Sequence, residues 1–557
     1  MLGKSKVRNI YASKPGDQVK HSEKSKMAHG KDNAADMVLV NANVVTLDAA
    51  DRKAQGVAIR DGKILAVGSN QEIRRFVNKA TRVIDVKDRT VLPGFIDSHA
   101  HLSHTALSLT SLDLSASRSI KEVIEQVHLS AKQLPTDKLI LAYGLDETKF
   151  AEKRFPTRFE LDEAAPDHYV LLMHVTGHAC ACNTRSLRYV NFPADEQGVD
   201  KELQTGEPTG VLRDPAVYPA RVKLMNLRND EELKRATWLA AEDAVRVGLT
   251  TIHSMGEPLG ERNVRIIEEI IEELPVRVKV YWKHSKAKTT GDIDDDVEKA
   301  RTRAGLKVIA DGAIETHTAA LFEPYTDDPS TKGMLYFTQE YMNELVLKAH
   351  KAGVQLAIHC ESDASIEQVL NAYENALSKH PRKDHRHRID HYELATEEQH
   401  KRVARLGVAL AMQPAFIYLW GGPDGKYRQF LGDERMKRAH TYASLLELGI
   451  LIAGGSDCPV THWNPVLGIH SLVNHPDSSQ RVSVRDALRI FTLDGAKIAF
   501  EEHLKGSIER GKFADLAVVT SDPLVSEPSK IIDIEVLMTI VSGNVVYAKQ
   551  PEFARHS

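Results

Sequence analysis

The feature that most constrains the fold is an alternation of short apolar runs with longer helix-like segments through residues 93–500. Such alternation predicts a parallel sheet, either open or closed into a barrel. The candidate helices span residues 230–247, 261–273, 339–352, 364–379 and 484–499. The candidate strands are "KLILAYG", "YVLLMHV", "GLTTIHS", "VRVKVYW", "GLKVIAD", "VQLAIHC", "HRIDHYE", "VALAMQP" and "ILIAGGSD".

Potential metal ligands stand at or just after the ends of these apolar runs. They occur in "GFIDSHAH", "GLKVIADG", "LAIHCE", "RIDHYE" and "AGGSDCP". In a (β/α)₈ barrel the carboxyl ends of the strands converge on one face, so residues hundreds of positions apart can meet around one ion. An open sheet would spread them along an edge. The sequence therefore predicts an α/β fold with a TIM barrel over residues 93–500.

Other segments flank or interrupt this barrel. Short β-type runs separated by Asp-Gly and Gly-Ser turns fill residues 37–92, and a second β-rich stretch fills residues 501–557, so the two are expected to pair into one sheet domain. The stretch of about 105–230 holds more strand and helix than one barrel unit needs, and we interpret it as an inserted subdomain over the barrel mouth. Residues 1–36 are polar and lysine-rich, which indicates a disordered tail.

Composition narrows the class of protein. With 557 residues, the chain is longer than chains that usually fold around a single hydrophobic core. Apolar residues make up 42%, charged residues 27%, and the net charge is −4, which argues against nucleic acid or an anionic membrane as partner. The lack of a long apolar run favours a soluble, cytoplasmic protein. The four cysteines fit reduced thiols of such a protein: Cys180, Cys182, Cys360 and Cys458.

Histidines are the first candidate ligands. Residues two apart on a strand point the same way, so His99 and His101 can face one centre while the small Ala100 faces the wall. Alone, this pair also fits a surface loop or a core histidine. His359 and His391 each stand at a strand end beside acidic residues that could orient the ring. The joint pattern favours a metal site.

Two further residues complete the candidate set. Asp457 follows two glycines that allow close backbone approach, and its carboxylate could bind a metal and accept a proton from metal-bound water, or could be a turn aspartate. Lys307 lies early in a buried apolar strand. A buried lysine with a depressed pKa can react with CO₂ to give a carbamate that bridges two metals. An ion pair of Lys307 with Asp311 or Glu315 is equally compatible with the spacing.

With these residues assembled, the sequence resembles the metal-dependent amidohydrolase superfamily, specifically its YtcJ-like branch (amidohydrolase family 3), which includes N-substituted formamide deformylase. The resemblance extends from about Met37 to about Tyr547. It is carried by "VLPGFIDSHAHL", "TGHACACNTRSL", "GEPTGVLRD", "KVIADGAIETHTAAL", "AIHCESD", "RIDHYE", "GGSDCPV" and "GSIERGKFADLAVVTSDPL".

The resemblance implies a distorted (β/α)₈ barrel, a composite β-sandwich from both chain ends, and one or two divalent metal ions, with zinc expected first. It also implies hydrolysis of a non-peptide C–N bond, with Asp457 as the catalytic proton acceptor and a carboxylated lysine among the ligands. A homodimer is expected. The implied ligands, all present in this chain, are His99, His101, Lys307, His359, His391 and Asp457.

Two departures from the family pattern concern the substrate. Relatives commonly carry a glycine-serine-arginine run where this chain has "IETHTAAL", so His317 replaces an expected arginine. They also commonly have small and apolar residues followed by glycine where this chain reads "HCESD". His178, His317 and Trp420 are candidates for substrate binding.

Rival functions remain open at this point. One is a hydrolase of cyclic amides or carbamates, or a mononuclear deaminase, on the same barrel; Lys307 argues against a deaminase, whereas Glu361 near His359 favours it. Another is a barrel that has lost catalysis. That case requires missing ligands, and none of the six is missing.

Overall fold

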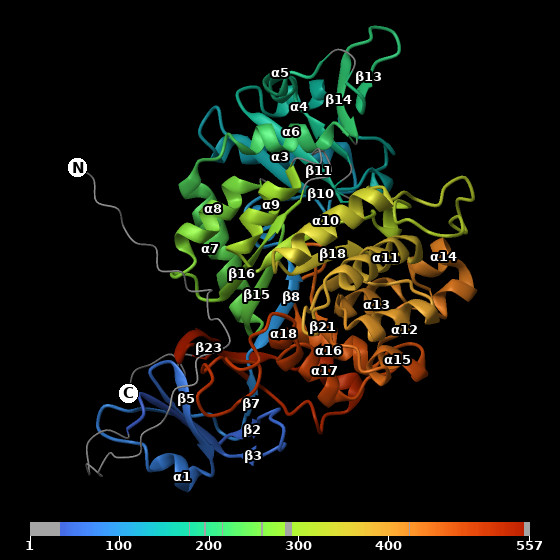
Figure 1. Cartoon of the computed structure of the whole chain (residues 1–557). Coiled ribbons are helices and arrows are strands. Elements are labelled where there is room, and N and C mark those ends of the chain that lie inside the picture. Colours follow the sequence, from blue (N-terminus) through green and yellow to red (C-terminus); the bar gives the residue numbers. More distant parts are fainter. Residues whose placement is uncertain are drawn as a thin grey trace, which may run out of the picture.

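The computed structural model describes residues 34–175, 177, 179–193, 196–213, 215–257, 260–284, 292–422 and 424–550. A sheet domain, a barrel and an insert follow one another along the molecule (Figure 1). Most of the tail expected over residues 1–36 lies outside the described residues. None of the described helices has the length and apolar character needed to span a lipid bilayer.

Eight parallel strands form the barrel, in the order β21-β20-β19-β18-β17-β16-β15-β8. The end strands meet just beyond β21, where the amide of Asp457 donates to the His99 carbonyl (2.7 Å) and the amide of His101 donates to the Cys458 carbonyl (2.9 Å). The barrel is thus nearly closed, which confirms the predicted fold class. The strands are β8 (Phe95–Ala100), β15 (Leu249–Met255), β16 (Arg277–Lys283), β17 (Gly305–Ile309), β18 (Leu356–Cys360), β19 (Arg388–His391), β20 (Ala409–Met412) and β21 (Ile452–Gly454).

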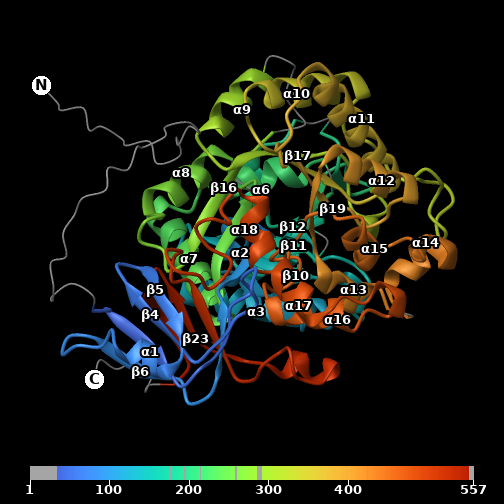
Figure 2. The same cartoon turned by 60° about the horizontal axis from the view of Figure 1, so that its bottom comes forward.

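Helices surround the strands, with α9 to α12 outside β16, β17 and β19 (Figure 2). Helix α7 shows why such segments are helical: a capping box between Asn229 and Glu232 starts it. Its buried alanines then allow close packing on α2. The bounds are α2 (Leu102–Leu109), α7 (Asp230–Arg246), α8 (Glu261–Ile270), α9 (Asp292–Arg301), α10 (Gln339–Lys351), α11 (Asp363–Lys379), α12 (Glu397–Leu406), α13 (Pro414–Trp420), α14 (Lys426–Met436), α15 (Tyr442–Glu447), α16 (Pro465–Val473), α17 (Val484–Ile490) and α18 (Leu493–Ile498).

The insert between β8 and β15 has a six-stranded sheet of its own, in the order β13-β14-β12-β11-β10-β9. Two runs from the list of candidate strands, "KLILAYG" and "YVLLMHV", belong to this sheet rather than to the barrel. Apolar runs alone do not reveal which sheet a strand joins. The elements are β9 (Leu112–Asp113), α3 (Ile120–Gln133), β10 (Leu139–Leu145), α4 (Arg158–Ala164), β11 (Tyr169–His174), β12 (Ala179–Cys182), α5 (Thr184–Val190), β13 (Val199–Lys201), β14 (Pro208–Arg213) and α6 (Val217–Met225).

Both chain ends build the sheet domain, whose sheets have the orders β5-β4-β1-β6 and β24-β23-β22-β7-β2-β3. Strand β7 pairs antiparallel with β22, and one apolar core joins residues of both ends. The elements are β1 (Met37–Val40), β2 (Asn43–Val45), β3 (Lys53–Ala54), β4 (Gly56–Arg60), β5 (Lys63–Gly68), α1 (Asn70–Arg74), β6 (Arg82–Asp85), β7 (Thr90–Pro93), β22 (Leu516–Val519), β23 (Val536–Val541) and β24 (Asn544–Ala548). Short 3₁₀ helices are η1 (Glu147–Lys149), η2 (Ile314–Thr316), η3 (Ser478–Gln480) and η4 (Pro528–Asp533).

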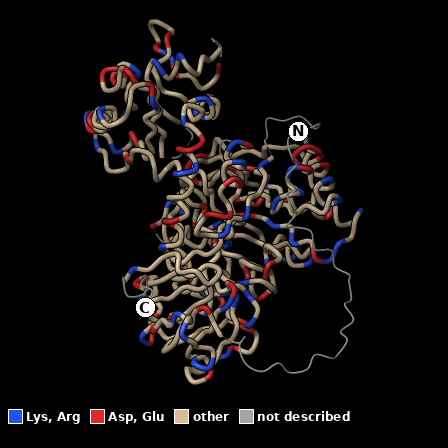
Figure 3. The backbone as a smooth tube through the Cα atoms, turned by 90° about the vertical axis from the view of Figure 1, so that its left-hand side faces the viewer, with Lys and Arg blue, Asp and Glu red and all other residues tan. Residues whose placement is uncertain are grey.

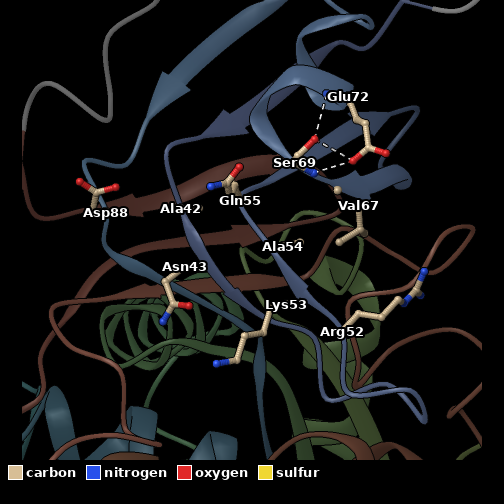
Figure 4. Close-up of a pocket in the computed structure, with 11 residues that line it drawn as sticks. Ala42, Asn43, Arg52, Lys53, Ala54, Gln55, Val67, Ser69, Glu72 and Asp88 are labelled. Carbon is tan, nitrogen blue, oxygen red and sulfur yellow. Dashed lines mark hydrogen bonds between the residues drawn. The ribbon is translucent and has the colours of Figure 1, made fainter.

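A hollow of about 710 Å³ opens on the sheet domain (Figure 4). Of its two acidic lining residues, Glu72 and Asp88, Glu72 is engaged in the capping box of α1: it accepts from the backbone amide and the hydroxyl of Ser69 (2.8 Å each). The carboxylate therefore serves the helix, and the lining residues include neither histidine nor cysteine.

Lys and Arg residues are interspersed with Asp and Glu residues over the described part of the molecule, from the sheet domain to the insert (Figure 3). Charge therefore does not divide the described part of the molecule into a basic and an acidic half, in keeping with the net charge of −4.

Three buried histidines form a network near the starts of β18 and β19. His387 Nδ1 accepts from the Leu356 amide (3.1 Å), so its Nε2 carries the proton and donates to His350 Nδ1 (2.8 Å). His385 Nδ1 accepts from the His387 amide (3.0 Å), and its Nε2 donates to the Leu406 carbonyl (2.8 Å). Each ring is thus neutral, with one nitrogen that accepts a hydrogen bond.

This network predicts a loss of stability in acid. Burial lowers the pKa of His350, His385 and His387 below the usual value. Below about pH 6.5 the unfolded chain binds protons at these positions, and the folded chain does not. The free energy of unfolding is therefore highest above that pH and decreases as the pH is lowered below it. The slope is up to about 1.4 kcal/mol per histidine per pH unit. Urea unfolding between about pH 8 and 5 measures this effect.

The variant His350→Gln supplies the comparison, since it removes one titrating group. Its pH dependence should be shallower than that of the parent chain. Equal slopes for both proteins would contradict the assignment of the effect to this network.

Gly455 lies where β21 approaches β8. A Cβ at this position would stand 2.7 Å from the backbone nitrogen of His99, closer than such atoms approach in proteins. We expect Gly455→Ala to push the segment before Asp457 away from His99 and to weaken metal binding at least roughly tenfold, because overpacking shifts the backbone. Metal titration of the apo-protein measures this loss. Gly422→Ala is the control, since nothing lies within 4 Å of its Cβ position and its backbone is not left-handed. Unchanged metal affinity in Gly455→Ala would contradict the prediction.

Candidate metal centre

The structure brings the candidate ligands to the carboxyl ends of the barrel strands. His99 is the last but one residue of β8, and His101 follows that strand; Lys307 lies in β17. His359 and His391 lie at the ends of β18 and β19, and Asp457 follows β21. In Figure 1 the insert lies at the end of the barrel toward which β8 runs.

His99, His391 and Asp457 form the centre of the site. Each offers a ligand atom, and these atoms all lie within 4.8 Å of one another. The Asp457 Oδ1 atom lies 3.3 Å from His99 Nε2 and 3.0 Å from His101 Nε2. The rings of His99 and His391 stand 4.7 Å apart, edge to face. Three strands far apart in sequence thus supply one compact donor set.

A second group shares His391. It consists of His359, Glu361 and His391, again with ligand atoms within 4.8 Å of one another. The rings of His359 and His391 are 4.4 Å apart. The two groups are adjacent, so the donor set could hold one ion or two.

The hydrogen bonds fit a metal ion. His359 Nε2 donates to the Gly312 carbonyl (2.9 Å), which leaves Nδ1 with its lone pair. Asp457 Oδ1 and His391 Nδ1 are buried and have no hydrogen-bond partner among the described residues. Buried polar atoms are normally satisfied, and orphaned atoms beside a nitrogen and carboxylate donor set point to an ion. Imidazole and carboxylate donors suit zinc-class ions.

Asp457 carries a negative charge in this setting. Although burial by itself raises the pKa of Asp457, the nearby ring nitrogens of His101 and His99 hold it well below its usual value. Burial lowers the pKa of His391 far below 6.5 and that of His359 to about 3, so both rings are neutral. Neutral imidazoles and an ionised carboxylate are the protonation states that metal ligation requires.

Lys307 is 2% exposed, and its partner is Asp390, whose Oδ2 accepts from Nζ (2.7 Å). This differs from the two partners that the spacing left open, Asp311 and Glu315. Burial lowers the pKa of Lys307. Although burial raises the pKa of Asp390, the charges of Arg388 and Lys307 hold it well below its usual value.

Asp390 also reaches the metal ligands on β8. Its Oδ2 lies 3.0 Å from His99 Nδ1, and its Oδ1 accepts from Arg388 Nε (2.6 Å). From the sequence, Asp390 and Glu393 are the acidic residues that could orient the neighbouring ring of His391; the structure instead places Asp390 against His99. In a regular strand, the adjacent residues Asp390 and His391 would point to opposite faces of the sheet. The left-handed backbone at His391 (φ 77°) breaks this alternation, so both side chains can lie close to His99.

The role of Arg388 was missed from the sequence. Its position two residues before Asp390 on one strand was the available signal, since such residues share a face.

The predicted substrate-binding residues have different outcomes. His178 lies outside the described residues. His317 Nε2 lies 2.9 and 3.0 Å from the two carboxylate oxygens of Asp327, and its ring stands 4.8 Å from that of Phe430. Trp420 and Phe430 pack against one apolar cluster that includes Ile314 of η2 and Tyr427 and Leu431 of α14. His317 and Trp420 therefore line the same part of the loops after the barrel strands.

Sequence comparison now identifies the family. Residues 82–547 match the profile of the Amidohydrolase family. The chain belongs to this family. It is 32% identical to YtcJ of Bacillus subtilis, over 90% of this chain and 97% of that protein. It is 27% identical to the N-substituted formamide deformylase of Arthrobacter pascens, over 92% of this chain and 98% of that protein.

Solved structures agree with this assignment. An uncharacterized metal-dependent hydrolase of Pyrococcus furiosus has 27% sequence identity and a TM-score of 0.74, and the match covers 88% of this amidohydrolase chain and 99% of that chain. Together with the described donor groups, the family supports the use of a divalent metal ion.

Proposed function

We propose that this amidohydrolase cleaves a non-peptide C–N bond, in an amide or an N-substituted formamide. The observation that carries the proposal is the convergence of His99, His391 and Asp457 within 4.8 Å at the barrel mouth. In this family such a donor set indicates hydrolysis.

The ligands would be His99, His101, His359, His391 and Asp457, with Lys307 as a further ligand after carboxylation, and one or two divalent ions, zinc first. Such an ion supplies a Lewis acid and lowers the pKa of water. Carboxylation joins the free Lys307 amine to the carbon of CO₂ with loss of one proton. The lowered pKa of Lys307 favours that free amine, and Asp390 can accept the remaining N–H.

Asp457 is the proposed catalytic acid and base. Its Oδ1 faces the nitrogens of His99 and His101, which leaves Oδ2 to accept the proton of the attacking water. The same oxygen returns that proton to the leaving nitrogen, so Asp457 ends the cycle ionised. Its low pKa ensures that it begins the cycle as a base.

Two measurements test the proposal. Elemental mass spectrometry gives the metal content of the purified protein, and an activity assay measures hydrolysis of a panel of formamides, acyl-amines and cyclic amides. Close to two ions per chain and release of amine support a two-metal site with carboxylated Lys307. Close to one ion shifts the assignment to a mononuclear enzyme. A chain that holds no metal and cannot be reloaded contradicts the proposal.

A mononuclear deaminase is the second candidate, and Glu361 favours it, because its carboxylate belongs to the group with His359 and His391. Ammonia release from aminopurines and aminopyrimidines in the same panel distinguishes the two. Ammonia release without amide cleavage would favour the deaminase.

A further inference from the structure

Three glutamates beside the metal centre take no part in the proposed amide hydrolysis. Glu361 follows β18, Glu393 lies two residues after β19, and Glu315 belongs to η2. Glu361 and Glu393 are 4% and 2% exposed, whereas Glu315 keeps part of its surface exposed. Among the described residues, no lysine or arginine forms an ion pair with these carboxylates, and the ring nitrogens beside Glu393 belong to His391 and His440.

Distances place this group directly against the metal ligands. Glu361 offers an oxygen within 4.8 Å of ligand atoms of His359 and His391. Glu393 Oε1 lies 4.0 Å from His391 Nδ1, and Glu393 Oε2 lies 4.0 Å from His440 Nε2. Both contacts of Glu393 are longer than hydrogen bonds. A ligand bound between these side chains would therefore adjoin the reacting centre.

The third glutamate joins the group through two rings. The Tyr427 hydroxyl donates to Glu315 Oε1 (2.5 Å). The ring of Tyr427 stacks on that of His440, with centroids 5.5 Å apart and planes 12° from parallel. Glu361 is tied to the same loop, because its Oε2 accepts from the backbone amide of Ile314 (2.7 Å). The three carboxylates thus surround one small region at the barrel mouth.

Polar atoms in this region lack partners. Both carboxylate oxygens of Glu393 and the Nε2 atom of His440 are buried and have no hydrogen-bond partner among the described residues. The two side chains are 2% and 3% exposed. Buried polar atoms are normally satisfied, and buried charges are normally paired. Burial lowers the pKa of His440 to about 3, so its neutral ring does not balance the carboxylate.

The proximity of the carboxylates is itself unfavourable. Burial, followed by the charge of Glu393, raises the pKa of Glu361 well above its usual value. Burial, followed by the charge of Glu315, does the same for Glu393. A positive charge among the three would offset both effects and stabilise the ionised carboxylates. The group therefore complements a cation that can donate several hydrogen bonds.

The surroundings favour an organic cation over a further metal ion. A divalent ion needs several donors around one point, and Glu393 belongs to neither donor group of the metal centre. Aromatic rings also line the region, since Tyr427 stacks on His440 and its centroid lies 6.0 Å from that of Trp420. An ammonium group donates to carboxylates and is attracted to aromatic faces.

We propose that Glu315, Glu361 and Glu393 form a subsite for an ammonium group on the non-reacting part of the substrate. The preferred substrates are then formamides or amides that carry an aliphatic amine. Glu315 and Glu361 lie in "IETHTAAL" and "HCESD", the two segments in which the chain departs from the family pattern. This inference rests on the proposed hydrolase function and deepens it, since it names the chemical class of the substrate.

Pairs of substrates that differ only in the charged group test the subsite. They are N-(3-aminopropyl)formamide with N-butylformamide, and N-(4-aminobutyl)formamide with N-pentylformamide. The metal-loaded protein should show a higher kcat/KM for the ammonium member of at least one pair. In Glu393→Gln the ratio within that pair should fall roughly 10- to 100-fold, because the amide keeps the shape and loses the charge.

Two further variants complete the comparison. In Glu315→Gln the ratio should also fall, but less, because this side chain is partly exposed. Glu398→Gln, at an exposed position of α12, is the matched control and should leave the ratio unchanged. Thermal melting checks the folding of each variant, and elemental mass spectrometry gives its metal content. If Glu393→Gln does not fold, Glu315→Gln decides by the same criterion.

The outcomes separate the subsite from the hydrolase proposal. Equal kcat/KM values within both pairs, or a preference that survives in Glu393→Gln, overturn the subsite while the hydrolase proposal stands. An equal loss of activity on both members of a pair, together with the loss of one ion per chain, assigns the carboxylates to a metal and also overturns it.

If the protein cleaves no amide, the hydrolase proposal fails, and calorimetric titration with butane-1,4-diamine decides the subsite alone. Binding that is lost in Glu393→Gln and retained in Glu398→Gln supports the subsite. Binding that is absent, or that persists in Glu393→Gln, overturns it.

Discussion

Replacement of Asp457 by asparagine is expected to lower kcat for amide hydrolysis roughly 10²- to 10⁴-fold, the usual contribution of a proton-transferring group. The amide keeps the shape and one oxygen but cannot accept the proton of the attacking water. Because Asp457 is buried against His99 and His101, the substitution also removes a charge from the donor set. Some loss of metal affinity is therefore expected too.

Steady-state kinetics at saturating metal separates the two effects. Metal content of the variant is measured in the same samples, so that kcat refers to loaded protein. Asp167→Asn, at an exposed position, is the control for the chemical change itself. If metal-loaded Asp457→Asn retains more than roughly a tenth of the parent kcat, the assignment of the proton transfer to Asp457 is wrong.

The second large effect is expected at Asp390, which we interpret as a positioning residue. Its carboxylate accepts from Lys307 and Arg388 and lies 3.0 Å from His99 Nδ1. Asp390→Asn leaves the buried guanidinium of Arg388 without its counter-charge and Lys307 Nζ without its acceptor. We expect the free energy of unfolding to fall by about 3–5 kcal/mol, the usual cost of breaking a buried ion pair. Metal affinity should fall about 10- to 100-fold, because His99 loses its orienting partner.

A double-mutant cycle distinguishes this role from general damage. Lys307→Met combined with Asp390→Asn removes the Lys307 amine together with its acceptor, so part of the stability should return while metal binding does not. Urea unfolding gives the stabilities, and titration of the apo-protein gives the affinities. If Asp390→Asn binds metal with the same affinity as the parent chain, Asp390 does not position the metal ligands. If the double variant is as unstable as the sum of the singles, the ion pair does not explain the loss.

The candidate ligands show how much of the site can be predicted from the sequence. The H-x-H pair, the strand-end histidines and the Gly-Gly-Ser-Asp run could be recognised because each follows an apolar strand, and parallel strands in a barrel bring their carboxyl ends together. That argument needs only local pattern and one general rule of topology. It predicts which side chains lie close together, and in the structure ligand atoms of His99, His391 and Asp457 lie within 4.8 Å of one another.

Local pattern did not reveal contacts between strands. The choice of Asp390 as the partner of Lys307 depends on the register in which β17, β18 and β19 pair, and the spacing of residues in the chain carries no information on that register. The orientation of His391 depends on a left-handed backbone that propensity does not predict.

The sequence by itself determined the barrel, because hydrophobic periodicity and turn residues act locally. It also predicted the sheet domain made from both chain ends and the set of candidate ligands. Only the tertiary structure decided the pairing of Asp390 with Lys307 and His99, and the contact of the His104 ring with the Tyr143 ring. These contacts join segments far apart in the chain. Packing selects them, and no short stretch of sequence encodes them.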